Sequence, residues 1–169
     1  VLKGHSRGVT ALCLLNDRMT LVSTGDDQSL RVWNIETGEL VRSLNQHTQP
    51  VHALALRPGA EGLPMISSAA GDRTIRLWQP TIGRMVRYVR LDAEPLNIAW
   101  LDGSRIAAVC VDGRVRVVDA DNVTVLDTLP AIDGWAYAVA AHPTDGCIVM
   151  GGANGQIRRF TSGQLSGDN

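Results

Sequence analysis

Two sets of side chains in the first half of the chain have the residue types of a proton relay. Each set contains a histidine, then a serine, an aspartate and a tryptophan in that order. The sets are His5, Ser23, Asp27 and Trp33, and His47, Ser68, Asp72 and Trp78. A histidine between a carboxylate and a hydroxyl group is the arrangement that activates the nucleophile of serine hydrolases. The same side chains can also form a closed hydrogen-bond network in which a buried indole N–H finds its acceptor.

The segments around these sets recur along the chain. Residues 21–34, 65–79, 106–119 and 148–160 each contain, at or near their end, a run of four residues: an aliphatic residue, an arginine, one further residue and then a large apolar residue. The last residues of these runs are Trp33, Trp78, Val118 and Phe160, with spacings of 45 (33 to 78), 40 (78 to 118) and 42 residues (118 to 160). A repeat of about 40–45 residues is typical of a blade of four β-strands.

Each repeat divides into short apolar or alternating runs separated by turn residues. In the first repeat the runs cover residues 9–15, 20–23, 30–33 and 39–44. This pattern predicts a meander of antiparallel strands. We expect blades at about 4–44, 45–91, 92–129 and 130–160, with a polar tail at 161–169. Neighbouring blades must stack to bury their faces, and the insertion at 57–64 is expected to be a surface connection.

The two polar sets and their neighbours resemble the WD40 repeat family, and the resemblance covers almost the whole chain. The family pattern is a Gly-His pair, a Ser or Thr, a turn Asp and a Trp-Asp pair. Its counterparts here are Gly4-His5, Ser23, Asp27 and Trp33-Asn34, and then Gln46-His47, Ser68, Asp72 and Trp78-Gln79. The resemblance implies an all-β fold, a β-propeller with four blades of four-stranded antiparallel sheet. It also implies that each set is a structural tetrad and that the chain is no enzyme, since catalysis needs an exposed nucleophile beside an oxyanion hole.

The third and fourth repeats depart from this pattern. Asp92, Ala108 and Val118 replace the His, Ser and Trp of the third repeat, where Asp112 and Asp119 remain. The corresponding positions of the fourth repeat hold Ile132, Met150, Asn154 and Phe160. We expect both blades to lack the tetrad and to depend on apolar packing.

One strand position carries an arginine in every repeat. The four residues are Arg31, Arg76, Arg116 and Arg158. Because this position alternates with core positions, we expect the arginines to face out of each blade. The alternative is a basic stripe that binds an acidic partner.

The sequence leaves open whether the four repeats form a complete ring. The chain starts at Val1 in the middle of a motif, and residues 1–3 have the place of the end of an outer strand, which could complete the last blade. Three arrangements are compatible with four repeats. The chain is a fragment of a larger propeller, or it forms a homodimer with an eight-bladed ring, or it closes on itself as a small ring.

The resemblance also implies where a partner binds, because loops from every blade converge at the mouth of a propeller's channel. The positions that face the mouth hold Thr10, His52, Asn97 and Tyr137, then Gly8, Pro50, Pro95 and Trp135, and then Asp26, Gly71, Val111 and Ala153. Trp135 and Tyr137 would be aromatic anchors. His52 and Asn97 would be polar contacts, and Asp26 the only acid. The alternative is that the two aromatic side chains only plug the fourth blade.

The function implied is a non-catalytic scaffold that binds a protein or peptide partner at the mouth of the channel. One alternative is a structural or regulatory module within a larger multidomain protein. Another is a small-ligand or enzyme site in the channel, which one Asp and one His on the rim support poorly.

The composition narrows the partners further. With 16 basic and 17 acidic residues the net charge is −1, so no basic patch for nucleic acid or an anionic membrane is expected. The longest apolar runs have the length of a strand, and no signal-peptide pattern is seen. Cys13, Cys110 and Cys147 lie in apolar runs without metal-ligand spacing, so we expect buried thiols and neither metal nor cofactor. The compartment stays open, with the cytoplasm favoured.

Overall fold

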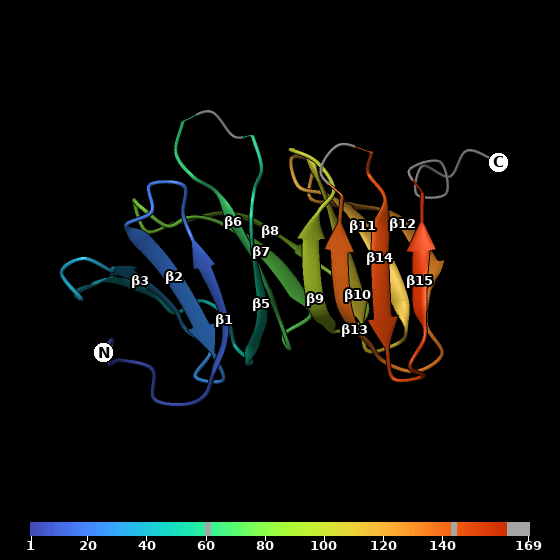
Figure 1. Ribbon diagram of the computed structural model, residues 1–169, viewed down its shortest axis with the longest axis horizontal. Coiled ribbons are helices and arrows are strands. Elements are labelled where there is room, and N and C mark those ends of the chain that lie inside the picture. The colour runs from blue at the N-terminus through green and yellow to red at the C-terminus, as the bar shows by residue number, and fades with distance from the viewer. Residues whose placement is uncertain (60–61, 143–144, 162–169) are drawn as a thin grey trace.

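The computed structural model describes residues 1–59, 62–142 and 145–161, and this part of the chain contains β-strands and no helix. The strands form four antiparallel meanders, which we call blades 1 to 4. Blade 1 consists of β1 (Val9–Leu14), β2 (Thr20–Gly25), β3 (Leu30–Asn34) and β4 (Leu40–Leu44). Blade 2 consists of β5 (Val51–Leu56), β6 (Ile66–Ala70), β7 (Thr74–Gln79) and β8 (Arg84–Arg90). The all-β fold predicted from the repeats is confirmed (Figure 1).

The last two blades continue this order. Blade 3 consists of β9 (Pro95–Trp100), β10 (Arg105–Cys110), β11 (Arg114–Asp119) and β12 (Thr124–Pro130). Blade 4 consists of β13 (Ala136–Ala141), β14 (Ile148–Gly152) and β15 (Ile157–Phe160). Within the described residues blade 4 therefore has three strands, one fewer than the expected four. Of the predicted polar tail, residues 162–169 lie outside the described part of the chain, as do residues 60–61 of the insertion between β5 and β6.

Apolar side chains between neighbouring blades form the core. Val22, Leu30 and Val32 of blade 1 pack with Ile66 and Trp78 of blade 2. The cluster between blades 2 and 3 contains Ala53, Ala69, Ile75, Ile98 and Trp100, among others. The cluster between blades 3 and 4 contains Val109, Val115, Val117, Ile148 and Met150, among others. Each blade is thus stabilised by the next, as expected of a repeat architecture.

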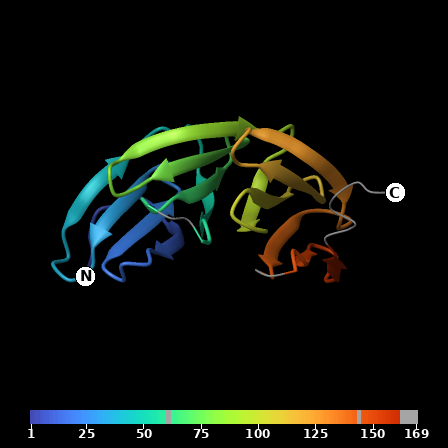
Figure 2. The same ribbon diagram turned by 90° about the horizontal axis from the view of Figure 1, so that it is seen from above.

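The four blades form an open arch. Figure 2 shows β4, β8 and β12 along its convex side and blades 1 and 4 at its two feet. The first strands of successive blades, β1, β5, β9 and β13, contact one another in order. Residues 1–4 lie at the opposite end of the arch from β15 (Figure 1), so they do not complete blade 4 of the same chain. Closure of the chain on itself as a small ring is therefore not the arrangement seen. No helix of the described residues has the length and apolar character to cross a membrane.

Candidate functional site

The polar set of blade 1 is assembled between the loop before β1, the end of β2 and the following turn. His5 Nδ1 lies 2.9 Å from the Asp27 carboxylate, and His5 Nε2 lies 2.7 Å from Ser23 Oγ. Trp33 Nε1 donates to the same Ser23 Oγ at 2.8 Å. Ser29 Oγ–H and the Ser6 amide also donate to Asp27. Burial raises the pKa of Asp27, but these hydrogen bonds outweigh it and hold the pKa at about 2.

Blade 2 repeats the geometry in a more buried form. His47 Nδ1 lies 2.8 Å from Asp72 and His47 Nε2 lies 2.7 Å from Ser68 Oγ, which accepts the Trp78 indole N–H at 2.8 Å. Because Trp78 can only donate, one tautomer gives every proton an acceptor, namely indole to Ser68, Ser68 to His47, and His47 to Asp72. A protonated imidazole would leave the Ser68 hydroxyl proton without the nitrogen as acceptor. Burial lowers the pKa of His47 despite the attraction of Asp72.

The structure therefore brings together the four residues of each set, in a geometry that does not suit a nucleophile. Ser68 is fully buried and Ser23 is 3% exposed. The hydroxyl oxygen that would attack a substrate already accepts an indole N–H and directs its proton to the histidine. A catalytic serine needs its oxygen open to a carbonyl carbon and an oxyanion hole beside it. The two sets consequently join strands within a blade.

The repeated arginines do not all face out of the blades, which corrects the expectation from the sequence. Arg31 Nη2 lies 3.7 Å from Asp27 and Arg76 Nη2 lies 3.3 Å from Asp72, so both fold back along the sheet toward the turn aspartate. Arg116 is 1% exposed and belongs to the interior of blade 3. Arg158 is exposed.

Arg116 connects two carboxylates at the place where blades 1 and 2 have the tetrad. Its Nε donates to Asp92 at 2.6 Å, and its Nη1 and Nη2 donate to Asp112 at 3.0 and 2.6 Å. These hydrogen bonds from Arg116 lower the pKa of both carboxyl groups. Blade 3 lacks the tetrad and packs through apolar clusters, as expected, but it also has an ionic clamp in place of the histidine network, which we did not predict from the sequence. The sequence did contain a signal for this clamp, namely Asp92 at the histidine position together with Asp112. Two carboxylates that lie close together require a cation between them.

Within its described residues, blade 4 has neither the tetrad nor the ionic clamp. Ile132 and Met150 are buried in the apolar cluster with blade 3, and Phe160 packs against it. Asn154 is exposed and accepts the Gln156 amide within its turn at 3.0 Å. This blade depends on apolar packing, as the sequence predicts.

The rim positions lie along one edge of the arch, the lower edge in Figure 1, where β2 and β14 end and β13 begins. In each blade a backbone amide from the turn after the second strand donates to a carbonyl just before the first strand. The pairs are Asp26 to Gly8, Gly71 to Pro50, Val111 to Glu94, and Ala153 to Trp135. Gly25 and Gly152 permit this approach, because a Cβ on either would collide with the carbonyl oxygen of Gly8 or Trp135.

The pairing of the first two strands of each blade shows that two rim positions of blade 3 are held by other residues than those predicted. Pro95 pairs with Cys110, as Val9 pairs with Gly25 and Val51 with Ala70, so Leu96 has the strand position of Thr10, His52 and Tyr137. Asn97 lies one residue further along, where its Nδ2 donates to the Tyr137 carbonyl at 3.3 Å. Likewise Glu94, and not Pro95, is the counterpart of Gly8 and Trp135. The link into β9 is one residue shorter than in the other blades, which alignment by the first aliphatic residue misses.

The polar rim residues make contacts between blades. The Thr10 hydroxyl donates to the Val51 carbonyl of blade 2. His52 Nε2 lies 2.7 Å from Glu94 Oε1 of blade 3, with both side chains partly exposed. Asp26 is therefore not the only acid of the rim. The Asp26 carboxylate lies over Gly8. Its Oδ2 is 2.9 Å from the place where a Cβ of Gly8 would be.

The two aromatic residues of the rim remain open to solvent. Trp135 is 53% and Tyr137 52% exposed, and their rings meet edge to face with centroids 6.2 Å apart. The interior of blade 4 is filled by Ile132 and Met150 instead. This arrangement disfavours the alternative in which the aromatic pair plugs the blade.

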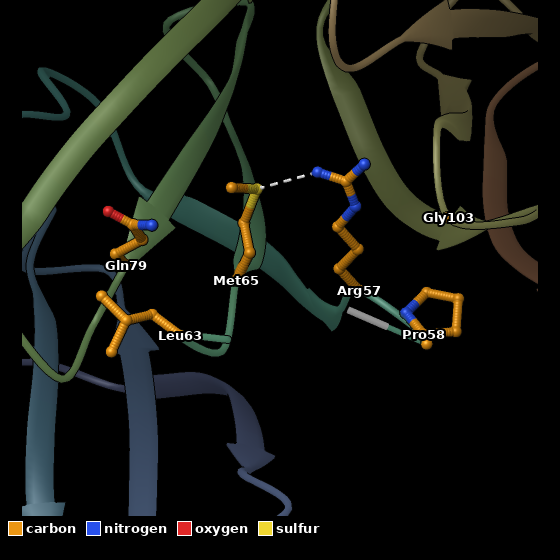
Figure 3. Close-up of a pocket in the computed structure, with 7 residues that line it drawn as sticks. Arg57, Pro58, Leu63, Met65, Gln79 and Gly103 are labelled. Atoms are coloured by element: carbon orange, nitrogen blue, oxygen red, sulfur yellow. Dashed lines mark hydrogen bonds between the residues drawn. The ribbon is translucent and has the colours of Figure 1, made fainter. Parts of the chain in front are cut away.

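A hollow of about 400 Å³ lies on the opposite edge of the arch, beside the insertion (Figure 3). Figure 3 shows Arg57 and Pro58 on one side of it, and Leu63, Met65 and Gln79 on the other. Arg57 Nη1 donates to Met65 Sδ at 3.5 Å and Nη2 lies 3.2 Å from Asp121 Oδ2, while the guanidinium stacks over Trp100 at 5.5 Å. The cation is thus already bound within the fold. Within the described residues no group of three His, Cys, Asp or Glu side chains could hold a metal ion.

Blades of antiparallel strands, stacked around an arch with their first strands inward, define a protein of the β-propeller class. Residues 1–34 and 38–79 match the family model described as "WD domain, G-beta repeat". These residues form two WD40 repeats that follow the family pattern, and the two later repeats of the chain depart from it.

Several curated relatives carry the same repeats. The chain is 26% identical to "WD repeat-containing protein 1-A" of Xenopus laevis over 164 residues, which cover 95% of this chain and 26% of that protein. It is 43% identical over 61 residues to "WD repeat-containing protein 41" of Homo sapiens (36% of this chain, 13% of that protein). It is 33% identical over 72 residues to "Ribosome biogenesis protein erb1" of Aspergillus clavatus (42% of this chain, 9% of that protein). The chain spans about a quarter of the length of the first of these relatives.

Proposed function

We propose that this chain is a non-catalytic interaction scaffold that binds a protein or peptide partner at the rim of the arch. Relatives built of WD repeats support a scaffold as the kind of function. The observation that carries the proposal is the half-exposed pair of Trp135 and Tyr137. Two large aromatic side chains that are exposed side by side are a typical anchor for a partner.

Polar groups around the pair suit a peptide backbone or polar side chains of a partner. Asp26, His52 and Glu94 are partly exposed on the same edge, and Asn97 links β9 to the Tyr137 carbonyl. An aromatic anchor with a polar surround is the usual anatomy of an interface. The interblade contacts of Thr10, His52 and Asn97 would hold the rim in one shape before binding, which limits the entropic cost of association.

A structural or regulatory module within a larger protein is the second candidate, because the chain corresponds to about a quarter of its full-length relatives. In that case the rim would contact other parts of the same protein. The chemistry of the contact would be the same, but a pull-down with the full-length protein would recover no separate partner.

The test is selection of peptides from a phage-displayed random library on the immobilised chain, followed by titration of the purified peptides by fluorescence anisotropy. We expect Trp135→Ala and Tyr137→Ala each to weaken the selected peptides at least about tenfold, or about 1.4 kcal/mol. Leu126→Ala on β12 is the matched control, since Leu126 is also 53% exposed but lies away from the rim. Equal affinity for the rim variants, or no selected peptide, would contradict the proposal.

A further inference from the structure

The two feet of the arch carry exposed apolar surfaces. On blade 1 the side chains of Val9, Leu12 and Leu14 are 53, 63 and 49% exposed, and with Leu21 they form what we call the leading face. On blade 4 the trailing face consists of Ala138, Ala140, Val149, Gly151 and Ile157. Ile157 is 78% and Val149 40% exposed.

Both faces occupy positions that are covered elsewhere in the arch. Leu54 pairs with Ser68 in blade 2 as Leu12 pairs with Ser23 in blade 1, and Leu54 packs into the core between blades 1 and 2. Ile75 pairs with Ala69 as Ile157 pairs with Gly151, and Ile75 is 1% exposed. The leading and trailing faces therefore correspond in position to the two sides of an interface between blades.

The contact of blades 2 and 3 shows how such faces fit. Small residues of blade 2, Ala53 and Ala69, pack with large residues of blade 3, Ile98 and Trp100. The register places Ala138 and Gly151 of the trailing face at the positions of Ala53 and Ala69.

The leading face supplies the large partners. Leu12 and Leu14 have the positions of Ile98 and Trp100, because Leu12 pairs with Ser23 as Ile98 pairs with Ala108, and Leu14 pairs with Leu21 as Trp100 pairs with Ile106. Small residues on blade 4 thus match large ones on blade 1, in the same order as across the interface of blades 2 and 3. Two charged side chains, Arg159 and Asp145, lie beside the trailing face, and Arg159 Nε donates to Cys147 Sγ at 3.0 Å.

We propose that two copies of this chain associate head to tail, with the leading face of each on the trailing face of the other, and close an eight-bladed ring. Both feet of the arch point to the same side (Figure 2), so a two-fold axis can bring both pairs of faces together at once. Closed symmetry limits the assembly to two copies, where a single open contact would propagate into fibres. The proposal does not depend on binding at the rim.

The first experiment is sedimentation equilibrium of the unaltered chain over a range of concentrations. We expect a mass of twice the 18.2 kDa of the single chain. A monomer at every concentration would overturn the proposal, which is the result if other segments cover these faces. This measurement uses the unaltered chain, so its result does not depend on whether a variant folds.

Variants decide which faces meet. Leu12→Asp and Ile157→Asp should each halve the mass, while Leu126→Asp on β12 should leave the dimer intact. A mixture of Leu12→Asp and Ile157→Asp should regain a dimer, because one unaltered leading face then meets one unaltered trailing face. A dimer of Ile157→Asp alone would indicate that two leading faces meet, and would overturn the head-to-tail arrangement. Circular dichroism checks each fold, and peptides selected for the rim should bind monomeric Leu12→Asp with unchanged affinity.

Discussion

At the scale of single residues, the serine oxygen decides between catalysis and structure. A hydrolase and this chain can use the same Ser, His and Asp side chains. Here Ser68 Oγ accepts the Trp78 indole N–H and gives its own proton to His47, which leaves no reactive lone pair facing solvent. The tryptophan that completes each set is thus the residue that identifies it as structural.

The neutral state of His47 predicts a dependence of stability on pH. Its pKa is lowered in the folded chain and lies near the usual value of about 6.5 in the unfolded chain. Between these two values the unfolded state binds more protons, so the contribution of His47 is fully present above pH 6.5 and is lost as the pH falls below it.

Urea unfolding from pH 8 to pH 5 measures this effect. We expect the free energy of unfolding to fall on acidification, with a smaller slope in His47→Asn because the titrating group is gone. Equal slopes in both proteins would show that His47 does not titrate differently on folding.

At the scale of elements, the sequence predicted the positions of the strands. It predicted only some of the side-chain interactions inside the blades. Alternating apolar runs and turn residues predicted four strands between residues 9 and 44 of the first blade, where β1 to β4 lie. The residues of the two tetrads were identified from the family pattern, and the structure brings them together. The rim of blade 3 was displaced by one residue, because a link that is shorter by one residue changes the register without changing composition.

The buried position of Arg116 was missed for a different reason. The sequence places an arginine at the same strand position in every blade, but burial depends on what faces it. Two carboxylates face Arg116, one carboxylate at 3.3 Å faces Arg76, and Arg158 is exposed. Exposure is thus set by contacts between distant residues, which the local pattern does not encode.

The clamp in blade 3 gives a prediction at this scale. Arg116→Met keeps most of the side-chain volume but removes five donors, and leaves Asp92 and Asp112 close together without a cation. Since both carboxylates are partly open to solvent, we expect a loss of about 2 kcal/mol in the free energy of unfolding, below the range for a fully buried pair. Urea unfolding measures it.

The control for this change is Arg158→Met at the same strand position of blade 4, where the arginine is exposed. It should change the free energy of unfolding by less than about 0.5 kcal/mol. Similar losses in the two variants would mean that the clamp adds nothing beyond an ordinary surface arginine.

At the scale of the whole molecule, the stabilising groups and the exposed aromatic pair of the rim are separated. The tetrads and the clamp join strands within blades 1 to 3, and apolar clusters join the blades. The aromatic pair of the rim lies outside these clusters and is half exposed. We therefore expect the chain to keep its fold when the proposed anchors are removed.

The most direct test of this separation is thermal unfolding of two variants that each remove aromatic rings. Trp78→Ala removes a fully buried indole, and we expect it to cost about 3–5 kcal/mol and to lower the Tm by roughly 6–20 °C. The double variant Trp135→Ala/Tyr137→Ala should melt within about 4 °C of the unaltered chain, because exposed substitutions usually change stability by less than about 0.5 kcal/mol each. If the double variant melted as low as Trp78→Ala, the aromatic pair would be part of the core and the rim would lose its proposed anchor.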